Sequence, residues 1–188
     1  VIWAAATALS LGMLKASNDR YLYAVEVSMG QMADVERLMR NKLVVRATIA
    51  EILLSLSGAP SNQIAKLRAD IDAIVVDVEA TIVKLRASEL SEKQMATLGR
   101  FEELHLLAKE QNAMAISLKL AGNDASATTL FLGDLGKTAD ALIVTIEELM
   151  GTIEDEARLH AAETAEAYNS ERLVLIGLFC LAILCTTT

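Results

Sequence analysis

Two uncharged apolar stretches at the ends of the chain most constrain what it can fold into. Residues 1–14 (VIWAAATALSLGML) and 173–188 (LVLIGLFCLAILCTTT) carry no charge, and all 17 Lys and Arg and all 25 Asp and Glu lie between Lys15 and Arg172. Such runs are typical of membrane helices, although each is shorter than the roughly 20 residues that cross a bilayer. We expect residues 1–14 to end a first transmembrane helix and residues 173–188 to begin a second.

The N-terminal stretch has a competing interpretation as a signal peptide, whose apolar core has a similar length. No basic leader precedes the stretch, and no small-residue cleavage pattern separates it from the residues that follow. We therefore favour the membrane helix. The chain is then expected to be part of a larger membrane protein, with residues 15–172 forming a water-exposed domain between two spans.

The charge of this middle region narrows the classes of function. The net charge of −8 belongs entirely to residues 15–172, and binding to nucleic acid requires a basic patch, so a nucleic-acid partner is not expected. The sequence contains no phosphate-binding Gly-rich loop, nucleophile elbow or Cys and His metal signature. Glu102-x-x-His105 has the spacing of di-iron bundles but lacks the second such pair that these need. We expect no enzyme activity, no catalytic residues, no metal and no cofactor.

Apolar residues recur at intervals of three and four, which predicts an all-helical fold. Helices are expected over residues 15–57, 61–88, 91–121 and 124–172, the last continuous with the C-terminal apolar stretch. Gly58-Ala59-Pro60 forces the first turn, Ser91 with Gln94 forms a capping box, and Gly122 closes the third helix before an Asp124 cap. The apolar rows predict the core positions, which are Val25, Met32, Met39 and Leu53 with Val35, Leu43, Ile49 and Leu56; Ile64, Leu67, Ile71, Ile74, Val78, Ile82 and Leu85; Leu98, Phe101, Leu104, Leu107, Met114 and Leu118; and Leu135, Leu142, Ile146, Leu149 and Ile153.

Helix lengths then predict the topology. The first and last helices would be about 64 and 73 Å long, against about 45 Å for the middle two. We therefore expect an antiparallel up-down-up-down four-helix bundle over residues 15–172, with helices 1 and 4 continuing into the transmembrane segments.

The turn before the last helix is Leu120-Ala121-Gly122-Asn123-Asp124, and Leu130, Leu132-Gly133 and Ala139-Asp140-Ala141-Leu142 follow it. With Met39-Arg40-Asn41 and Arg46 on the first helix, this pattern resembles the extracytoplasmic four-helix-bundle sensor domain of bacterial methyl-accepting chemotaxis proteins and related sensor kinases. The resemblance covers most of the chain. It implies a homodimer in the bacterial inner membrane, with residues 15–172 periplasmic or extracellular. It also implies signal transduction to cytoplasmic signalling machinery through regions absent from this chain.

Candidate ligand-binding residues come from polar positions at one height of the expected bundle. Arg46 and Gln111 interrupt apolar rows there, near Asp72, Glu110 and Thr138. In the resembled family, arginines of the first helix and a Thr of the fourth bind acids, which implies roles for the residues Arg40, Arg46, Thr128, Thr129 and Thr138. An Arg suits a carboxylate because its planar fork donates two parallel hydrogen bonds. We expect the domain to bind a small organic or amino acid, or else a periplasmic binding protein.

Other interpretations stay open at this point. Arg46 could be satisfied by Asp72 or Glu110 and serve only to fix helix register. The domain could belong to a histidine kinase, or it could be a non-sensing helical spacer or part of a pore-forming bundle. The polar residues Arg46 and Gln111 argue against a pure spacer, which would tolerate an uninterrupted apolar seam.

Overall fold

The computed structural model describes residues 2–55 and 61–186, and all its regular secondary structure in these ranges is helical, without a strand. The helices are α1 (Ile2–Leu54), α2 (Ser61–Ala87), α3 (Glu92–Leu120), α4 (Asp124–Leu130) and α5 (Gly136–Thr186), with a π-helical turn η1 (Phe131–Leu135) between α4 and α5. The predicted all-helical fold is confirmed. The predicted turn at Gly58-Ala59-Pro60 lies outside the described residues.

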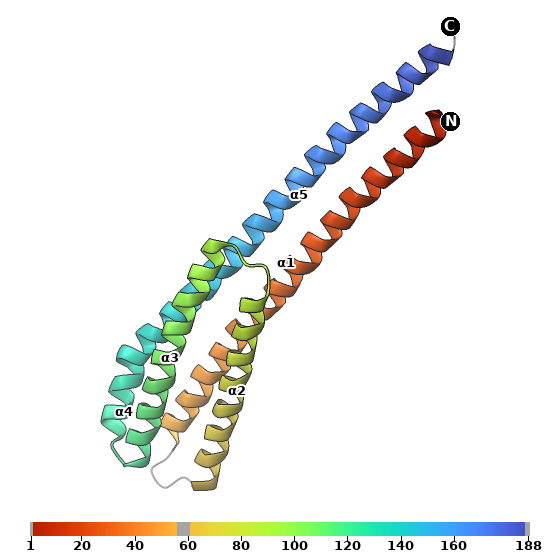
Figure 1. Ribbon diagram of the computed structural model, residues 1–188. Coiled ribbons are helices and arrows are strands. Elements are labelled where there is room, and N and C mark those ends of the chain that lie inside the picture. Colours follow the sequence, from red (N-terminus) through yellow and green to blue (C-terminus); the bar gives the residue numbers. More distant parts are fainter. Residues whose placement is uncertain (1, 56–60, 187–188) are drawn as a thin grey trace. The chain divides into compact units, whose positions relative to one another are not determined.

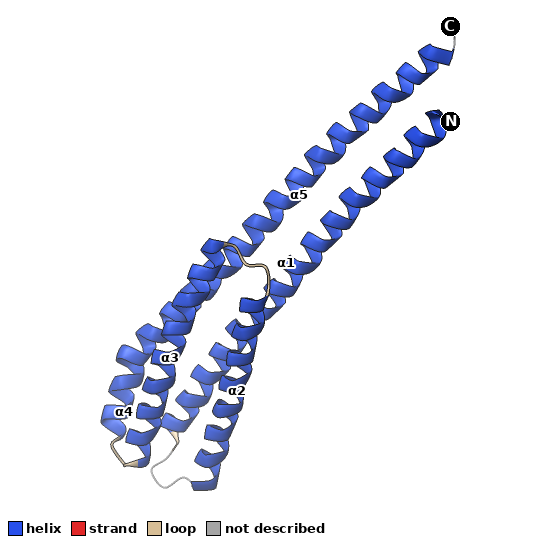
Figure 2. Cartoon of the chain, viewed as in Figure 1, coloured by secondary structure: helices blue, strands red, loops and turns tan. Residues whose placement is uncertain are grey.

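The chain divides into two compact units, which we describe separately. The central unit is Gln31–Ile153, and the terminal unit combines Val1–Gly30 with Glu154–Thr188. Both α1 and α5 contribute residues to each unit, whereas α2 and α3 belong to the central unit alone. Within the central unit, α1, α2, α3 and α5 lie side by side (Figures 1 and 2).

The core of the central unit consists of two apolar clusters. One joins α1, α2, α3 and α5, with Phe101, Leu38, Leu85 and Ile146 almost fully buried. The other joins α1, α2, α3 and η1 around Ile49, Ile52, Ile71, Ile116 and Leu135. The predicted core face of α5 is confirmed, since Leu142, Ile146, Leu149 and Ile153 are each at most 2% exposed.

The predicted core faces of α1 and α3 are wrong in part. On α1 the buried row is Val35, Leu38, Val45, Ile49 and Ile52, and the predicted row of Met32, Met39 and Leu53 lies at its edge, only partly buried. The prediction of Leu43 in the core is wrong, since it is 49% exposed, and Leu56 lies outside the described residues. On α3, Leu107 and Met114 are exposed, while small Ala108 and Ala115 are buried. On α1 the buried row lies one position before the predicted heptad row. On α3, Leu98 and Phe101 are buried as predicted, and the buried face lies one position later only from His105 onward, where small alanines allow the helices to pack closely.

Helix ends follow local capping chemistry. Ser91 accepts a hydrogen bond from the Gln94 amide and Gln94 returns one to the Ser91 amide, so the predicted capping box is confirmed. Gly122 has a φ of 75°, the left-handed conformation that favours glycine at a helix end. The predicted Asp124 cap is wrong: Asn123 caps α4 by accepting from the Ser126 amide, and Asp124 pairs with Lys119.

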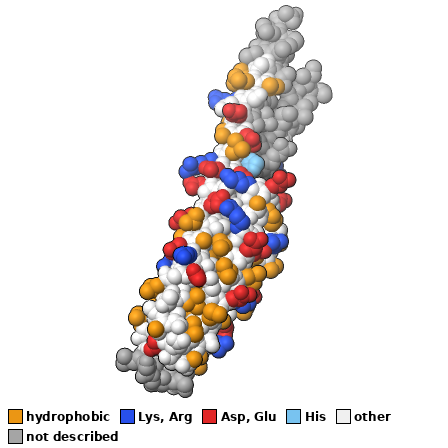
Figure 3. All heavy atoms as spheres, turned by 90° about the vertical axis from the view of Figure 1, so that its left-hand side faces the viewer, with side chains coloured by type: hydrophobic (Ala, Val, Ile, Leu, Met, Phe, Trp, Pro, Cys, Tyr) orange, Lys and Arg blue, Asp and Glu red, His pale blue; other side chains and the backbone are white. Residues whose placement is uncertain are grey.

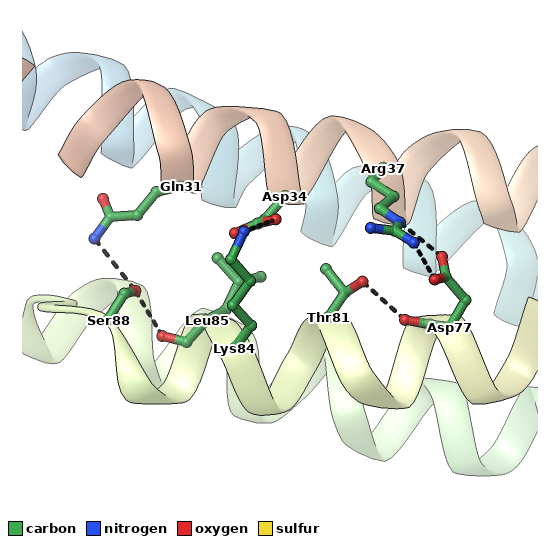
Figure 4. A network of polar contacts seen from close by, with 8 residues as sticks. All are labelled: Gln31, Asp34, Arg37, Asp77, Thr81, Lys84, Leu85 and Ser88. Atoms are coloured by element: carbon green, nitrogen blue, oxygen red, sulfur yellow. Dashed lines mark hydrogen bonds and ion pairs between the residues drawn. The ribbon is translucent and has the colours of Figure 1, made fainter. Parts of the chain in front are cut away.

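Polar contacts join α1 to α2 along one side of the central unit (Figure 4). Gln31 donates to the carbonyl of Glu89, just beyond the end of α2, at 2.9 Å, and Lys84 of α2 donates to buried Asp34 at 2.8 Å. Farther along, Arg37 donates to both carboxylate oxygens of Asp77. These contacts fix the register of the two helices.

No helix in the described part of the chain contains a stretch long and apolar enough to cross a membrane. The assignment of residues 1–14 and 173–188 to transmembrane helices stays a prediction.

Candidate functional site

The two arginines chosen from the sequence lie in different surroundings. Arg40 is exposed on α1, and its charge acts on the α1–α2 contact around Asp77. There, hydrogen bonds from Arg37 and Asn41 lower the pKa of Asp77, and the charge of Arg40 adds to this effect. Arg40 therefore contributes to an exposed ion-pair cluster.

Arg46 makes an exposed ion pair with Asp140 of α5. Its Nη1 lies 2.7 Å from Asp140 Oδ1, and the two side chains are 42% and 66% exposed. The partner expected from the sequence, Asp72 or Glu110, is wrong, because this face of α1 lies against α5. An exposed pair of this kind contributes about 0–1 kcal/mol, so Arg46 is not a buried register-fixing charge.

The threonines differ in how free their hydroxyl groups are. Thr138 is buried and donates to the Asp134 carbonyl at 3.0 Å. Thr129 is exposed and donates to the Ala125 carbonyl at 2.9 Å, and Thr128 is exposed beside it on α4. The hydroxyl protons of Thr129 and Thr138 are therefore already donated to backbone carbonyl groups one helical turn earlier.

Gln111 on α3 is partly buried, and its Oε1 is fully buried without a hydrogen-bond partner among the described residues. An unsatisfied buried acceptor costs about 1–3 kcal/mol, so it marks a position where a donor would be favourable. Of the six candidate residues, only Arg46 lines the cavity that α1, α3, η1 and α5 enclose.

That cavity has a volume of about 30 Å³, which holds one or two water molecules and is too small for an amino acid. Arg46, Lys42 and Asn112 are its polar lining residues. The rest of its lining is apolar and belongs to α1, α3, η1 and α5, namely Val45, Ile49, Ala108, Phe131, Leu135, Gly136, Ala139, Leu142 and Ile143.

The π-helical turn η1 forms one wall of this cavity through Phe131 and Leu135. A π turn adds one residue to a helical turn, which makes it a rare feature that is frequent at functional sites. Gly136 follows directly, and a Cβ atom there would lie 3.1 Å from the Phe131 carbonyl oxygen. Sequence reasoning predicted one uninterrupted helix here; the glycines of Phe131-Leu132-Gly133-Asp134-Leu135-Gly136 were the available signal.

Lys42 also lines the cavity, and its ammonium group contacts a buried histidine. Lys42 Nζ donates to Nδ1 of His105, a residue of α3 that is 3% exposed. A lysine ammonium only donates, so His105 Nδ1 accepts and the ring proton resides on Nε2. That Nε2 is buried without a hydrogen-bond partner among the described residues.

Burial dominates the electrostatics of this pair. It lowers the pKa of Lys42 to about 8, and burial together with the charge of Lys42 lowers the pKa of His105 to about 4. Lys42 Nζ also lies 5.5 Å from the ring centre of Phe101, against which His105 stacks with a centroid separation of 6.2 Å. The pair thus combines a partly buried cation with a neutral imidazole and an aromatic ring.

The sequence did not single out Lys42, and it considered His105 only as a metal ligand. The available signal was the four-residue spacing between Lys42 and Arg46, which places both on one side of α1. In the described part of the chain, no group of three His, Cys, Asp or Glu side chains could hold a metal ion.

No protein-family model, curated protein or solved structure matches this chain.

Proposed function

We propose that the chain is the sensor segment of a transmembrane receptor, with the central unit sensing a small molecule. One observation carries this proposal: α1 and α5 contain 53 and 51 residues, against 27 and 29 for α2 and α3, and only the two long helices contribute to both units. Helices of this kind can connect a sensing unit to a separate segment, and apolar residues 1–14 and 173–188 would place that segment in a bilayer.

The proposed topology of the central unit is antiparallel up-down-up-down. Ion pairs support this topology, because the residue numbers of the partners on α2 fall as those on α1 rise. Asp34 pairs with Lys84, and Arg37 pairs with Asp77. Glu79 with Lys109 and Arg86 with Glu102 relate α2 to α3 in the same way. Short connections between antiparallel neighbours are typical of four-helix bundles.

We place the switching element of the receptor at η1. A π turn can convert to an α turn by moving its extra residue, and this changes the register of the helix that follows. Because α5 begins at Gly136, directly after η1, such a change would alter the packing of α5. Coupling between two such states typically amounts to 1–3 kcal/mol, which is enough to bias a signalling output.

The ligand is expected to be a small organic or amino acid, presented freely or by a periplasmic binding protein. The charged residues of the face in Figure 3 are of both signs and interspersed, which suits recognition of a small polar molecule better than binding of a polyanion. The arrangement proposed for the whole receptor is a homodimer in the bacterial inner membrane. Its output is chemotaxis signalling, or a histidine kinase as the alternative.

A thermal-shift screen of the complete chain in detergent micelles tests this function. We expect at least one organic acid or amino acid to raise the melting temperature in proportion to the logarithm of its concentration above the Kd. Arg46→Gln tests the sequence-based site: loss of the ligand-induced shift would assign Arg46 to binding, and an undiminished shift would remove it from the site. A folded chain that responds to none of the compounds would refute small-molecule sensing.

A non-sensing helical spacer is the second candidate. The small volume of the Arg46 cavity, about 30 Å³, favours it, because no amino acid fits there. The same screen separates the two functions, since a spacer has no ligand that raises its melting temperature.

A further inference from the structure

A second and larger hollow lies between α2 and α3 of the central unit. Its volume is about 420 Å³, within the range of small-molecule pockets and sufficient for an amino acid. The first half of α2 supplies Arg68 and Asp72, and the second half of α3 supplies Lys109 and Asn112. We name this hollow the α2–α3 groove.

The charged groups of the groove are not equally available. Lys109 Nζ lies 2.9 Å from Glu79 Oε1, so this ammonium is already paired. Arg68 and Asp72 form no ion pair with any residue in the described ranges, although both line the groove. The groove therefore offers one uncommitted cation and one uncommitted anion on the same helix.

Spacing brings these two groups within reach of one molecule. Arg68 and Asp72 are four residues apart on α2, so their Cβ atoms lie about 5–6 Å from each other on one helix face. The carboxylate and ammonium groups of an α-amino acid sit on one carbon atom. A guanidinium can bind the carboxylate through two hydrogen bonds, and a carboxylate can accept from the ammonium.

The floor of the groove is apolar. Ile71 and Ile116 form this floor and are each only 5% exposed, whereas Val75, half-buried, and Leu120, 56% exposed, also line the groove and present apolar surface to it. A ligand with an apolar side chain would cover this surface, whereas a dicarboxylic acid would bring a second anion toward Asp72.

We propose that the α2–α3 groove binds an α-amino acid with an apolar side chain. Arg68 holds its carboxylate, Asp72 holds its ammonium group, and the side chain packs on Val75 and Leu120. This inference rests on the proposed sensing function and supplies the binding site that the 30 Å³ cavity is too small to provide.

Asn112 connects this groove to the proposed switch. It lines both the α2–α3 groove and the small cavity walled by η1. A ligand that draws the Asn112 side chain toward the groove would change the lining of that cavity, which gives the ligand a route for favouring one state of η1 over another.

The test is a thermal-shift titration of the complete chain in detergent micelles with L-leucine and L-valine. Two analogues, 4-methylpentanoate and 3-methylbutylamine, each lack one of the two charged groups of leucine. We expect at least one of the two amino acids to raise the melting temperature. Each of the two analogues should require at least a tenfold higher concentration than leucine to produce the same shift. Arg68→Gln and Asp72→Asn should each weaken amino-acid binding at least tenfold.

Lys66→Gln and Asp70→Asn are the matched controls, because they remove the same charges from exposed positions of α2 that do not line the groove. Both should retain the wild-type response. If amino acids still raise the melting temperature of Arg68→Gln and Asp72→Asn, the groove site is overturned but small-molecule sensing is not. The same conclusion follows if only other organic acids raise the melting temperature of the wild-type chain. A folded chain unresponsive to every compound would overturn both proposals.

Discussion

The buried His105 makes a quantitative prediction about pH and stability. Its pKa is lowered from 6.5 to about 4, chiefly by burial and then by Lys42, with Lys109 acting in the same direction and Glu79 and Glu102 in opposition. A lowered histidine pKa means that the unfolded chain binds the proton more tightly than the folded chain. The free energy of unfolding should therefore fall as pH decreases from 6.5 toward 4, and level off below 4 for this group.

The magnitude follows from the two pKa values. The difference between 6.5 and about 4 corresponds to a total loss of about 3 kcal/mol, because one pKa unit is ~1.4 kcal/mol. Integrated between pH 7 and pH 5, the loss is about 2 kcal/mol. His105→Asn keeps an acceptor near the Nδ1 position but does not titrate, so this part of the pH dependence should disappear.

Chemical unfolding of the complete chain in detergent micelles, followed by circular dichroism at several pH values, measures this difference. Wild type should lose about 2 kcal/mol more than His105→Asn between pH 7 and pH 5. His160→Asn is the control, because this other histidine has a 59% exposed side chain and should behave like wild type. If the loss of unfolding free energy between pH 7 and pH 5 in His105→Asn is within ~0.5 kcal/mol of the wild-type loss, the reasoning is refuted. Such a result would mean that burial does not lower the pKa of the His105 imidazole.

Four further substitutions test the local structure. Ser91→Ala should lower the free energy of unfolding by about 1 kcal/mol through loss of the capping box, whereas an unchanged value would mean that the cap does not contribute. Gly136→Ala should lower the free energy of unfolding by about 1 kcal/mol, because the new Cβ would lie 3.1 Å from the Phe131 carbonyl oxygen. The control Gly151→Ala on the same helix, where a Cβ meets no neighbouring atom within 4 Å, should raise the free energy of unfolding by about 0.5–1 kcal/mol. Equal effects of the two substitutions would contradict the π turn. Arg46→Gln should change the free energy of unfolding by less than ~1 kcal/mol, as expected for an exposed ion pair, and a larger loss in the same unfolding assay would indicate a buried role.

The sequence predicted the fold well wherever hydropathy and capping chemistry acted together. Leu142, Ile146, Leu149 and Ile153 repeat at helical spacing and all are buried, and Ser91 with Gln94 caps α3 as expected. The prediction was wrong where small residues face the core. Ala108 and Ala115 are buried while Leu107 and Met114 are exposed, because the closeness of helix packing depends on neighbouring helices that periodicity does not identify.

The candidate site was harder to predict because it depends on pairings across helices. The sequence placed Arg46 in a buried layer, but a one-position rotation of α1 leaves it exposed beside Asp140. The same rotation directs Lys42 toward His105, a contact between residues 63 positions apart. The π turn was also missed, since its single extra residue leaves the overall helical pattern almost unchanged.

Two unusual features of the central unit adjoin the same cavity. Lys42 is a partly buried cation whose contact is a neutral imidazole rather than a carboxylate, and η1 is a π turn in place of a regular α turn. Well-packed apolar residues in place of a buried ionic group are often more stable, so stability alone gives no reason for Lys42 to occupy this position. In the proposed receptor, a change in η1 at this cavity would alter the packing of α5, and Asn112, which lines both hollows, would link that change to the α2–α3 groove.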